Sequence, residues 1–121
     1  MNYDNAVMQR NLNYLKTIEG GGVMQYMITA YDGEDMLEKR LEVRPRHLEN
    51  LQNVKGKIIC AGGLLDEEGK MKGSMLVMEF EKKEYLDEYL SSEPYIQEEV
   101  WDTVYVENMN VVLVNGEKVG A

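Results

Sequence analysis

The pattern of apolar and polar positions along the chain predicts strands that alternate with helices. Runs of β-branched, aromatic and other apolar residues suit strands, and apolar residues at helical spacing recur between them. We expect strands at residues 24–31, 57–65, 71–81 and 101–114, and helical segments at residues 35–43, 45–55, 82–91 and 96–100. This β-α-β-β-α-β order is typical of an α+β, ferredoxin-like split βαβ fold, in which helices cover one face of an antiparallel sheet.

Proline is expected to divide the first helical region into two. The residue before a proline avoids helical backbone, so Arg44-Pro45 predicts a break in which Pro45 opens a second helix that ends at Gly56. Residues 112–121 are expected to form a tail.

The first 23 residues are expected to stand apart from the domain. Residues 1–19 carry a weak helical stripe, and Gly20-Gly21-Gly22 then predicts a flexible linker. We interpret residues 1–23 as an N-terminal extension or a cloning remnant. Residues 24–121 are then one domain with a C-terminal tail, which fits a total length of 121 residues.

The strand at residues 57–65 is apolar at both alternating sets of positions. A sheet with one wet face would alternate apolar and polar residues, and helices on one side can cover only one face. The other face would leave a larger apolar patch than monomers tolerate, so we expect a homodimer formed through that face. Cys60 lies in the middle of this strand and is expected to be buried and inert.

Composition narrows the classes of function. The formal net charge of −9 repels polyanions, so nucleic acid and anionic membranes are not expected partners. No apolar run reaches the length of a membrane span, and the N-terminus lacks the apolar core of a signal peptide. Cys60 is the only cysteine, which fits a reducing compartment, and we expect a cytoplasmic protein.

The candidate catalytic and anion-binding residues are concentrated in the segment Arg44-Pro45-Arg46-His47-Leu48. His47 is the only histidine of the chain, and histidine exchanges protons near neutral pH. Guanidinium groups suit carboxylates and phosphates, so we expect Arg44 to bind an anionic group and Arg46 to be a surface charge. Two alternatives stay open: His47 as a buried structural residue, and Arg44 in an ion pair with Glu42 or Glu38. One histidine and one cysteine make no credible set of transition-metal ligands.

A set of short motifs extends this interpretation. They are Leu37-Glu38-Lys39-Arg40-Leu41, Val43-Arg44-Pro45, His47-Leu48, Ala61-Gly62, Gly73-Ser74 and Pro94-Tyr95. In this order and spacing, residues 24–108 resemble the YciI-like (YCII-related) family. The resemblance implies ferredoxin-like chains paired into a dimeric α/β barrel, with a histidine–aspartate pair as the acid–base unit. In this chain the pair would be His47 and Glu93, where the family has an aspartate. The extra methylene of Glu93 changes the reach of the carboxylate.

The resemblance also implies a substrate site around this pair. We expect Ser74 and Tyr95 to bind substrate together with Arg44; the alternatives are a β-bulge at Ser74 and a core position for Tyr95. The leading hypothesis is a small-molecule enzyme without a cofactor, which catalyses lyase- or hydrolase-like proton transfer on a small metabolite, aromatic or acidic, with an anionic ligand expected at Arg44. Two alternatives are a non-catalytic dimer that binds a small ligand and an oxygenase-like barrel that needs haem or a self-oxidising substrate.

Overall fold

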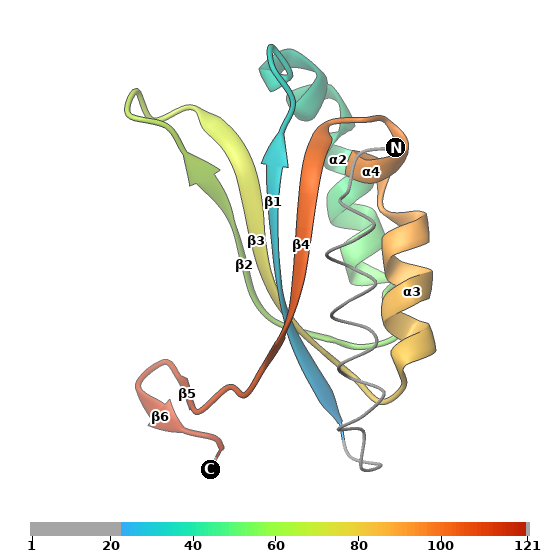
Figure 1. Ribbon diagram of the computed structural model, residues 1–121, viewed down its shortest axis with the longest axis vertical. Coiled ribbons are helices and arrows are strands. Elements are labelled where there is room, and N and C mark those ends of the chain that lie inside the picture. The colour runs from blue at the N-terminus through green and yellow to red at the C-terminus, as the bar shows by residue number, and fades with distance from the viewer. Residues whose placement is uncertain (1–22, 121) are drawn as a thin grey trace.

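A four-stranded antiparallel sheet, covered on one face by helices, forms the body of the chain in the computed structural model, which describes residues 23–120 (Figure 1). The strands lie in the order β2-β3-β1-β4. The elements are β1 (Met24–Asp32), α2 (Leu37–Gln52), β2 (Lys57–Leu65), β3 (Met71–Phe80), α3 (Lys83–Ser92), α4 (Pro94–Gln97), β4 (Trp101–Met109), β5 (Leu113–Val114) and β6 (Glu117–Lys118). This arrangement confirms the predicted ferredoxin-like α+β fold. The predicted helical stripe at residues 1–19 and the triple glycine lie outside the described residues.

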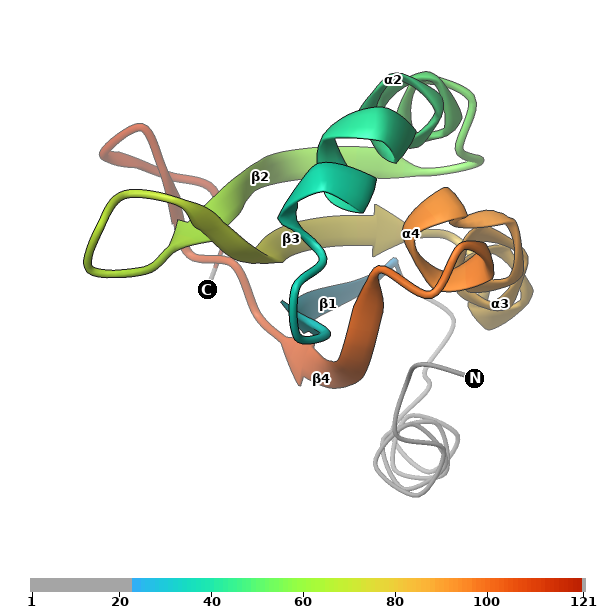
Figure 2. The same ribbon diagram turned by 90° about the horizontal axis from the view of Figure 1, so that it is seen from above.

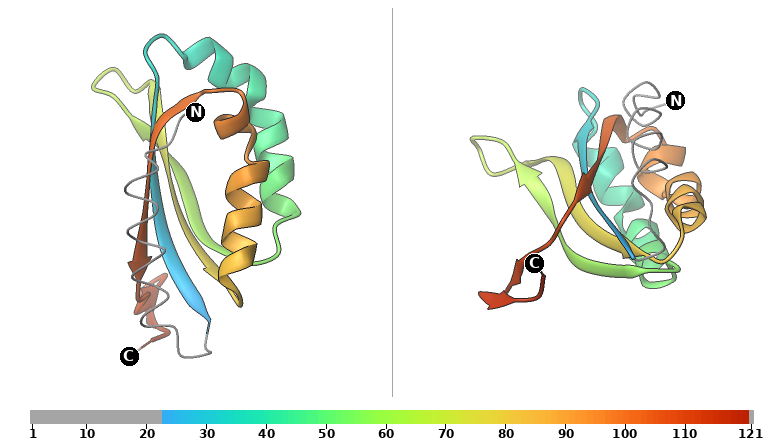
Figure 3. Two further views of the ribbon diagram at one scale, coloured as in Figure 1. Left: turned by 45° about the vertical axis from the view of Figure 1, so that its right-hand side comes forward. Right: turned by 60° about the horizontal axis from the view of Figure 1, so that its bottom comes forward.

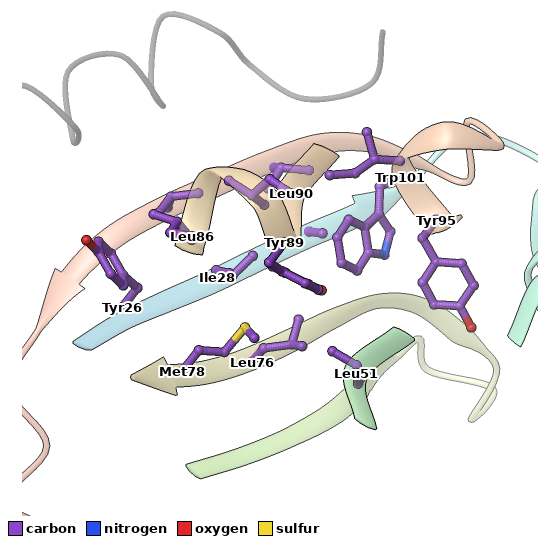
Figure 4. Close-up of a cluster of buried hydrophobic side chains, with 14 of the residues drawn as sticks. Tyr26, Ile28, Leu51, Leu76, Met78, Leu86, Tyr89, Leu90, Tyr95 and Trp101 are labelled. Atoms are coloured by element: carbon purple, nitrogen blue, oxygen red, sulfur yellow. The ribbon is translucent and has the colours of Figure 1, made fainter. Parts of the chain in front are cut away.

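The core lies between the sheet and the helices, all of which stand on the same side of the sheet (Figures 2 and 3). Along β1 every second side chain is buried, and Tyr26 and Ile28 stand opposite Met78 and Leu76 of β3. Leu86 of α3 completes this layer with no exposed surface, as Figure 4 shows. Full burial of an apolar side chain of this size contributes about 1.5–3 kcal/mol, so these contacts hold α3 on the sheet.

The predicted break before Pro45 is wrong, because α2 runs through this proline as one helix of 16 residues. Arg40, Val43, His47 and Leu51 recur at helical spacing and are all buried, whereas Pro45 lies on the exposed side. A proline inside a helix costs about 3 kcal/mol. The continuous buried stripe offsets that cost, since it has anchors on both sides of the proline. Because α2 continues through Pro45, His47 lies in the middle of a helix and not at a helix start.

No described helix covers the sheet face opposite α2 and α3; the C-terminal segment reaches only one end of it, where the backbone N–H of Val111 donates to the side chain of Gln25 at 2.8 Å. Met27 of β1, Val77 of β3 and Cys60 of β2 are register partners along this face. The expectation that Cys60 is buried is wrong: it is exposed, because β2 is an edge strand and nothing in the described chain covers its outer side. The homodimer that would cover this face stays a prediction.

The C-terminal part differs from the predicted long strand and tail. β4 ends at Met109, and a short hairpin follows in which β5 pairs with β6. Asn115 and Gly116 form its turn with φ angles of 52° and 78°. Asn-Gly is a strong signal for such two-residue hairpin turns, since both positions need positive φ. Across residues 23–120, no helix has the length and apolar character that crossing a membrane would require.

Candidate functional site

His47 and Glu93 meet beneath the helix layer although 46 residues separate them in sequence. His47 projects from the buried face of α2, and Glu93 lies between α3 and α4. The Nδ1 atom of His47 is 2.7 Å from Oε1 of Glu93, and the two residues are 8% and 0% exposed. The structure thus brings together the two residues predicted to form an acid–base pair.

Three donors surround the carboxylate of Glu93. Its Oε1 atom accepts hydrogen bonds from His47 and from the backbone N–H of Tyr95 at 3.0 Å, which makes Glu93 the N-cap of α4. Its Oε2 atom accepts a hydrogen bond of 2.5 Å from the hydroxyl of Tyr89. A buried carboxylate is costly unless its oxygens are bonded, and here both are. An ionised carboxylate only accepts, so with Glu93 ionised the proton of this hydrogen bond lies on Nδ1 of His47.

Aromatic rings fix the plane of the imidazole. The ring of Tyr95 stacks on His47 with centroids 4.2 Å apart and planes inclined by 20°. Trp101 approaches the imidazole edge-on, at 6.1 Å and 73°. Tyr95 and Trp101 lie side by side at the end of the core that faces α4 (Figure 4). Burial raises the pKa of Tyr95, so its phenol stays protonated at neutral pH.

A second buried polar group, which sequence reasoning missed, lies next to this pair. Arg40 is 5% exposed and bonds both carboxylate oxygens of Asp32, at 2.8 and 3.0 Å. Its other terminal nitrogen donates to the hydroxyl of Ser74 at 2.6 Å, and its guanidinium lies 4.8 Å from the ring centroid of Tyr95. Burial raises the pKa of Asp32 above its ordinary value of 3.8, although the charge of Arg40 opposes this. The signal for Arg40 was present in the sequence: it is a charged residue on the apolar stripe of α2.

A cavity of about 140 Å³ opens between α2 and the strands β2 and β3. The polar residues that line it are Arg40, Arg44, His47, Ser74 and Tyr95, and its apolar wall includes Leu48, Leu51, Met71 and Leu76. Every predicted site residue except Glu93 therefore borders this cavity. Glu93 does not line it, but it is hydrogen-bonded to His47, which does. Within residues 23–120, no three histidine, cysteine or acidic side chains are grouped as a metal site would require.

The two arginines of the basic motif differ in their surroundings. Arg44 lines the cavity and forms no ion pair with another described residue. Arg46 does not line it and instead pairs with Glu98 at 3.4 Å, where Lys39 also binds. These two cations hold the pKa of the partly exposed Glu98 carboxyl below its usual range. Arg44 is thus available to a ligand, whereas Arg46 connects α2 to the loop after α4.

Gly63 shapes the wall of the cavity. A Cβ atom at this position would lie 2.2 Å from the sulfur of Met71, so only glycine lets the Met71 side chain take its place beside β2.

Comparison with known proteins gives consistent matches over the same region. The family profile of the YCII-related domain matches residues 24–110. "Protein YciI" of Escherichia coli O6:H1 is 35% identical over 91 residues, which covers 69% of this chain and 93% of that protein. An uncharacterized protein of Haemophilus influenzae is 31% identical with the same coverage.

A solved structure matches the fold as well. It is the 5-chloro-2-hydroxyhydroquinone dehydrochlorinase (TftG) from Burkholderia phenoliruptrix AC1100, in complex with 2,5-dihydroxybenzoquinone. The superposition has a TM-score of 0.64 at 25% identity, over 71% of this chain and 93% of the other.

Proposed function

This chain belongs to the YCII-related family, and we propose that it is a small-molecule enzyme in which His47 and Glu93 together transfer a proton. One observation carries the proposal: the 2.7 Å bond between a buried carboxylate and a histidine that forms the wall of a cavity. A histidine that acts as a base must direct one ring nitrogen at the substrate. A hydrogen bond from the other ring nitrogen to a carboxylate fixes the tautomer and the orientation that this requires.

The bond to Glu93 assigns a role to each imidazole nitrogen. Nδ1 donates to the carboxylate, so Nε2 is left with a lone pair that can accept a proton from a substrate. When Nε2 is protonated, the negative charge of Glu93 stabilises the imidazolium. The stacked ring of Tyr95 keeps the imidazole in one plane during both steps. Positioned acid–base groups of this kind contribute typically 10²–10⁴-fold to a rate.

The cavity favours a small substrate with an anionic or oxygen-rich edge. Arg44 supplies a guanidinium without a partner among the described residues, and Arg40 and Ser74 add buried donors on the same wall. Removal of a proton from carbon leaves negative charge on a neighbouring oxygen, and fixed cationic donors stabilise such charge best in a site with little water. A volume of about 140 Å³ suits a compact metabolite of the size of one substituted ring.

The reaction class that we propose is a cofactor-independent elimination or a related proton transfer. In the elimination, the C–H proton moves to Nε2 of His47, the electron pair forms a new double bond and the leaving group departs with its own pair. TftG, the solved relative, is a dehydrochlorinase, and its structure is a complex with a hydroxylated quinone. The likeness in fold supports an elimination of this kind, and the same base could activate a water in a hydrolase-like reaction.

The experiment begins with 2,5-dihydroxybenzoquinone as the probe, whose binding is measured by calorimetry. Arg44→Ala should weaken binding about 10- to 100-fold, the effect of losing one hydrogen bond between charged groups. Arg46→Ala is the matched control on the same helix, and it should change binding by less than about twofold, because Arg46 is engaged with Glu98 outside the cavity. Equal losses in the two variants would contradict a specific site at Arg44.

Turnover is then tested with chlorinated and hydroxylated ring compounds, including 5-chloro-2-hydroxyhydroquinone, by the release of chloride. We expect release above the rate without protein for at least one compound, and its loss in His47→Asn. Probe binding without any turnover would favour the alternative, a non-catalytic module that binds small ligands.

A further inference from the structure

We propose that Tyr89 is a positioning residue of the His47–Glu93 pair, and that it acts by holding the carboxylate of Glu93 in the orientation that His47 requires. The inference rests on the proposed function for its catalytic consequence. Its structural part concerns only which nitrogen of His47 carries a proton, and this can be tested without a substrate.

The geometry connects Tyr89 to His47 through one carboxylate. Tyr89 lies on α3, four residues before Glu93, and its side chain is 2% exposed. Its hydroxyl donates to Oε2 of Glu93 at 2.5 Å, while Oε1 receives His47 and the N–H of Tyr95. Both carboxylate oxygens of Glu93 therefore accept hydrogen bonds, and the donors lie on three different helices: Tyr89 on α3, His47 on α2 and Tyr95 on α4. Figure 4 shows the phenol ring of Tyr89 lying between α3 and the sheet, within the packed core.

A glutamate side chain has one more torsion than an aspartate, so its carboxylate has more orientations available and more to lose without a second hydrogen bond. Its terminal torsion between Cγ and the carboxylate is broad, so hydrogen bonds to Oε1 alone would let the carboxylate turn. The hydrogen bond of Tyr89 to Oε2 opposes that turn and keeps Oε1 directed at Nδ1 of His47. Because Glu93 has no exposed surface, water cannot readily replace the hydroxyl.

Tyr89 can act only as a donor in this arrangement. Burial, and after it the charge of Glu93, raises the pKa of Tyr89 well above its ordinary value of 10.0. The phenol therefore keeps its proton throughout the neutral range. It donates to the carboxylate and does not compete with the carboxylate for the proton of Nδ1.

The test uses the fact that the chain has a single histidine. With histidine labelled in ¹⁵N, NMR of neutral imidazole gives the ratio of the Nδ1–H to the Nε2–H tautomer of His47 directly, with no ambiguity of assignment. In the parent protein the Nδ1–H tautomer should dominate. In Tyr89→Phe the ratio should fall about tenfold, as expected when a charge-assisted hydrogen bond is weakened. An unchanged ratio in a folded Tyr89→Phe variant would overturn the proposal.

Two further variants separate positioning from general effects on the fold. Tyr85→Phe removes a hydroxyl from the same helix, at a half-buried ring beside Lys55 and Lys82, and should leave the ratio unchanged. In a Glu93→Gln background the amide offers one acceptor oxygen instead of two, so Tyr89→Phe should change the ratio by less than about twofold. A change as large as in the parent background would mean that Tyr89 does not act through Glu93, and would overturn the proposal.

The parent protein allows a measurement that does not depend on any variant folding. A buried hydroxyl that donates to a carboxylate exchanges slowly with water, so the hydroxyl proton of ¹³C-labelled Tyr89 should appear as a downfield resonance. Its absence would overturn the proposal. If the tautomer ratio responds as expected but no variant affects any turnover, the role of Tyr89 stands and the proposed enzyme function fails.

Discussion

Replacing Arg40 by methionine should destabilise the protein in a way that depends strongly on pH. Methionine keeps the unbranched stem of the side chain but removes the guanidinium that bonds both oxygens of Asp32. The carboxyl of Asp32 is then left buried without its cation. This carboxyl can avoid a buried negative charge by taking up a proton. The variant is then destabilised by the free energy of keeping Asp32 protonated at neutral pH, instead of by the free energy of burying an unpaired carboxylate.

The protonation cost can be worked out from the titration of Asp32. Keeping a carboxyl protonated costs about 1.36 kcal/mol per pH unit above the unfolded value of about 3.9, which gives a ceiling of about 4 kcal/mol at pH 7 and about 1.5 kcal/mol at pH 5. Burial already raises the folded pKa of Asp32, and the loss of Arg40 raises it further. A raised folded pKa means that the folded state binds the proton more tightly. Protonated Asp32 therefore contributes fully to the stability of the folded protein below its unfolded-state pKa. This contribution is lost as the pH rises through its folded-state pKa.

The assay is unfolding in guanidinium chloride at pH 5 and pH 7, at one fixed protein concentration because association changes apparent stability. The destabilisation caused by Arg40→Met, relative to the parent at each pH, should be about 2–3 kcal/mol larger at pH 7. Lys39→Met is the matched control: Lys39 pairs with Glu98 on the surface, and its loss should cost less than about 1 kcal/mol at either pH. Equal costs of Arg40→Met at the two pH values would refute the reasoning.

Two further predictions concern the assembly and the domain boundary. The sheet face without helices, around Met27 and the exposed Cys60, should pair with a second copy of the chain, so sedimentation should show a dimer at micromolar concentration; a stable monomer would contradict this. A variant that begins at Val23 should keep the melting temperature within about 3 °C and the same sedimentation behaviour, since we propose residues 24–121 as the domain. Loss of folding or association on truncation would make residues 1–22 part of the structure.

The order of the main elements could be predicted from the sequence because apolar runs that suit strands alternate with apolar residues at helical spacing. The break at Pro45 was wrong because a local rule about proline was outweighed by tertiary packing of Val43 and Leu51, which only the fold makes visible. Cys60 was placed in the core because a strand of apolar residues does not reveal that it lies at the edge of the sheet.

The candidate site was predictable in part. His47 stood out as the single histidine, and Glu93 came from the resemblance to a family motif rather than from any local pattern. The other members of the site are harder to predict: Arg40 is recognisable only as a charged residue among apolar ones on its helix, and nothing in the sequence connects it with Asp32, or Tyr89 with Glu93. A stripe shows that a residue faces inward, but the partner that a buried polar group meets depends on how three separate elements pack.

If His47 transfers the proton, its replacement should lower the rate of turnover while leaving ligand binding unchanged. The most direct measurement compares kcat for His47→Asn with kcat for the parent protein, on a substrate found by the chloride-release screen, with the dissociation constant for 2,5-dihydroxybenzoquinone measured in parallel. We expect kcat to fall by about 10²–10⁴-fold while the dissociation constant stays within about threefold. A folded His47→Asn variant whose kcat stays within about threefold of the parent would contradict proton transfer by His47.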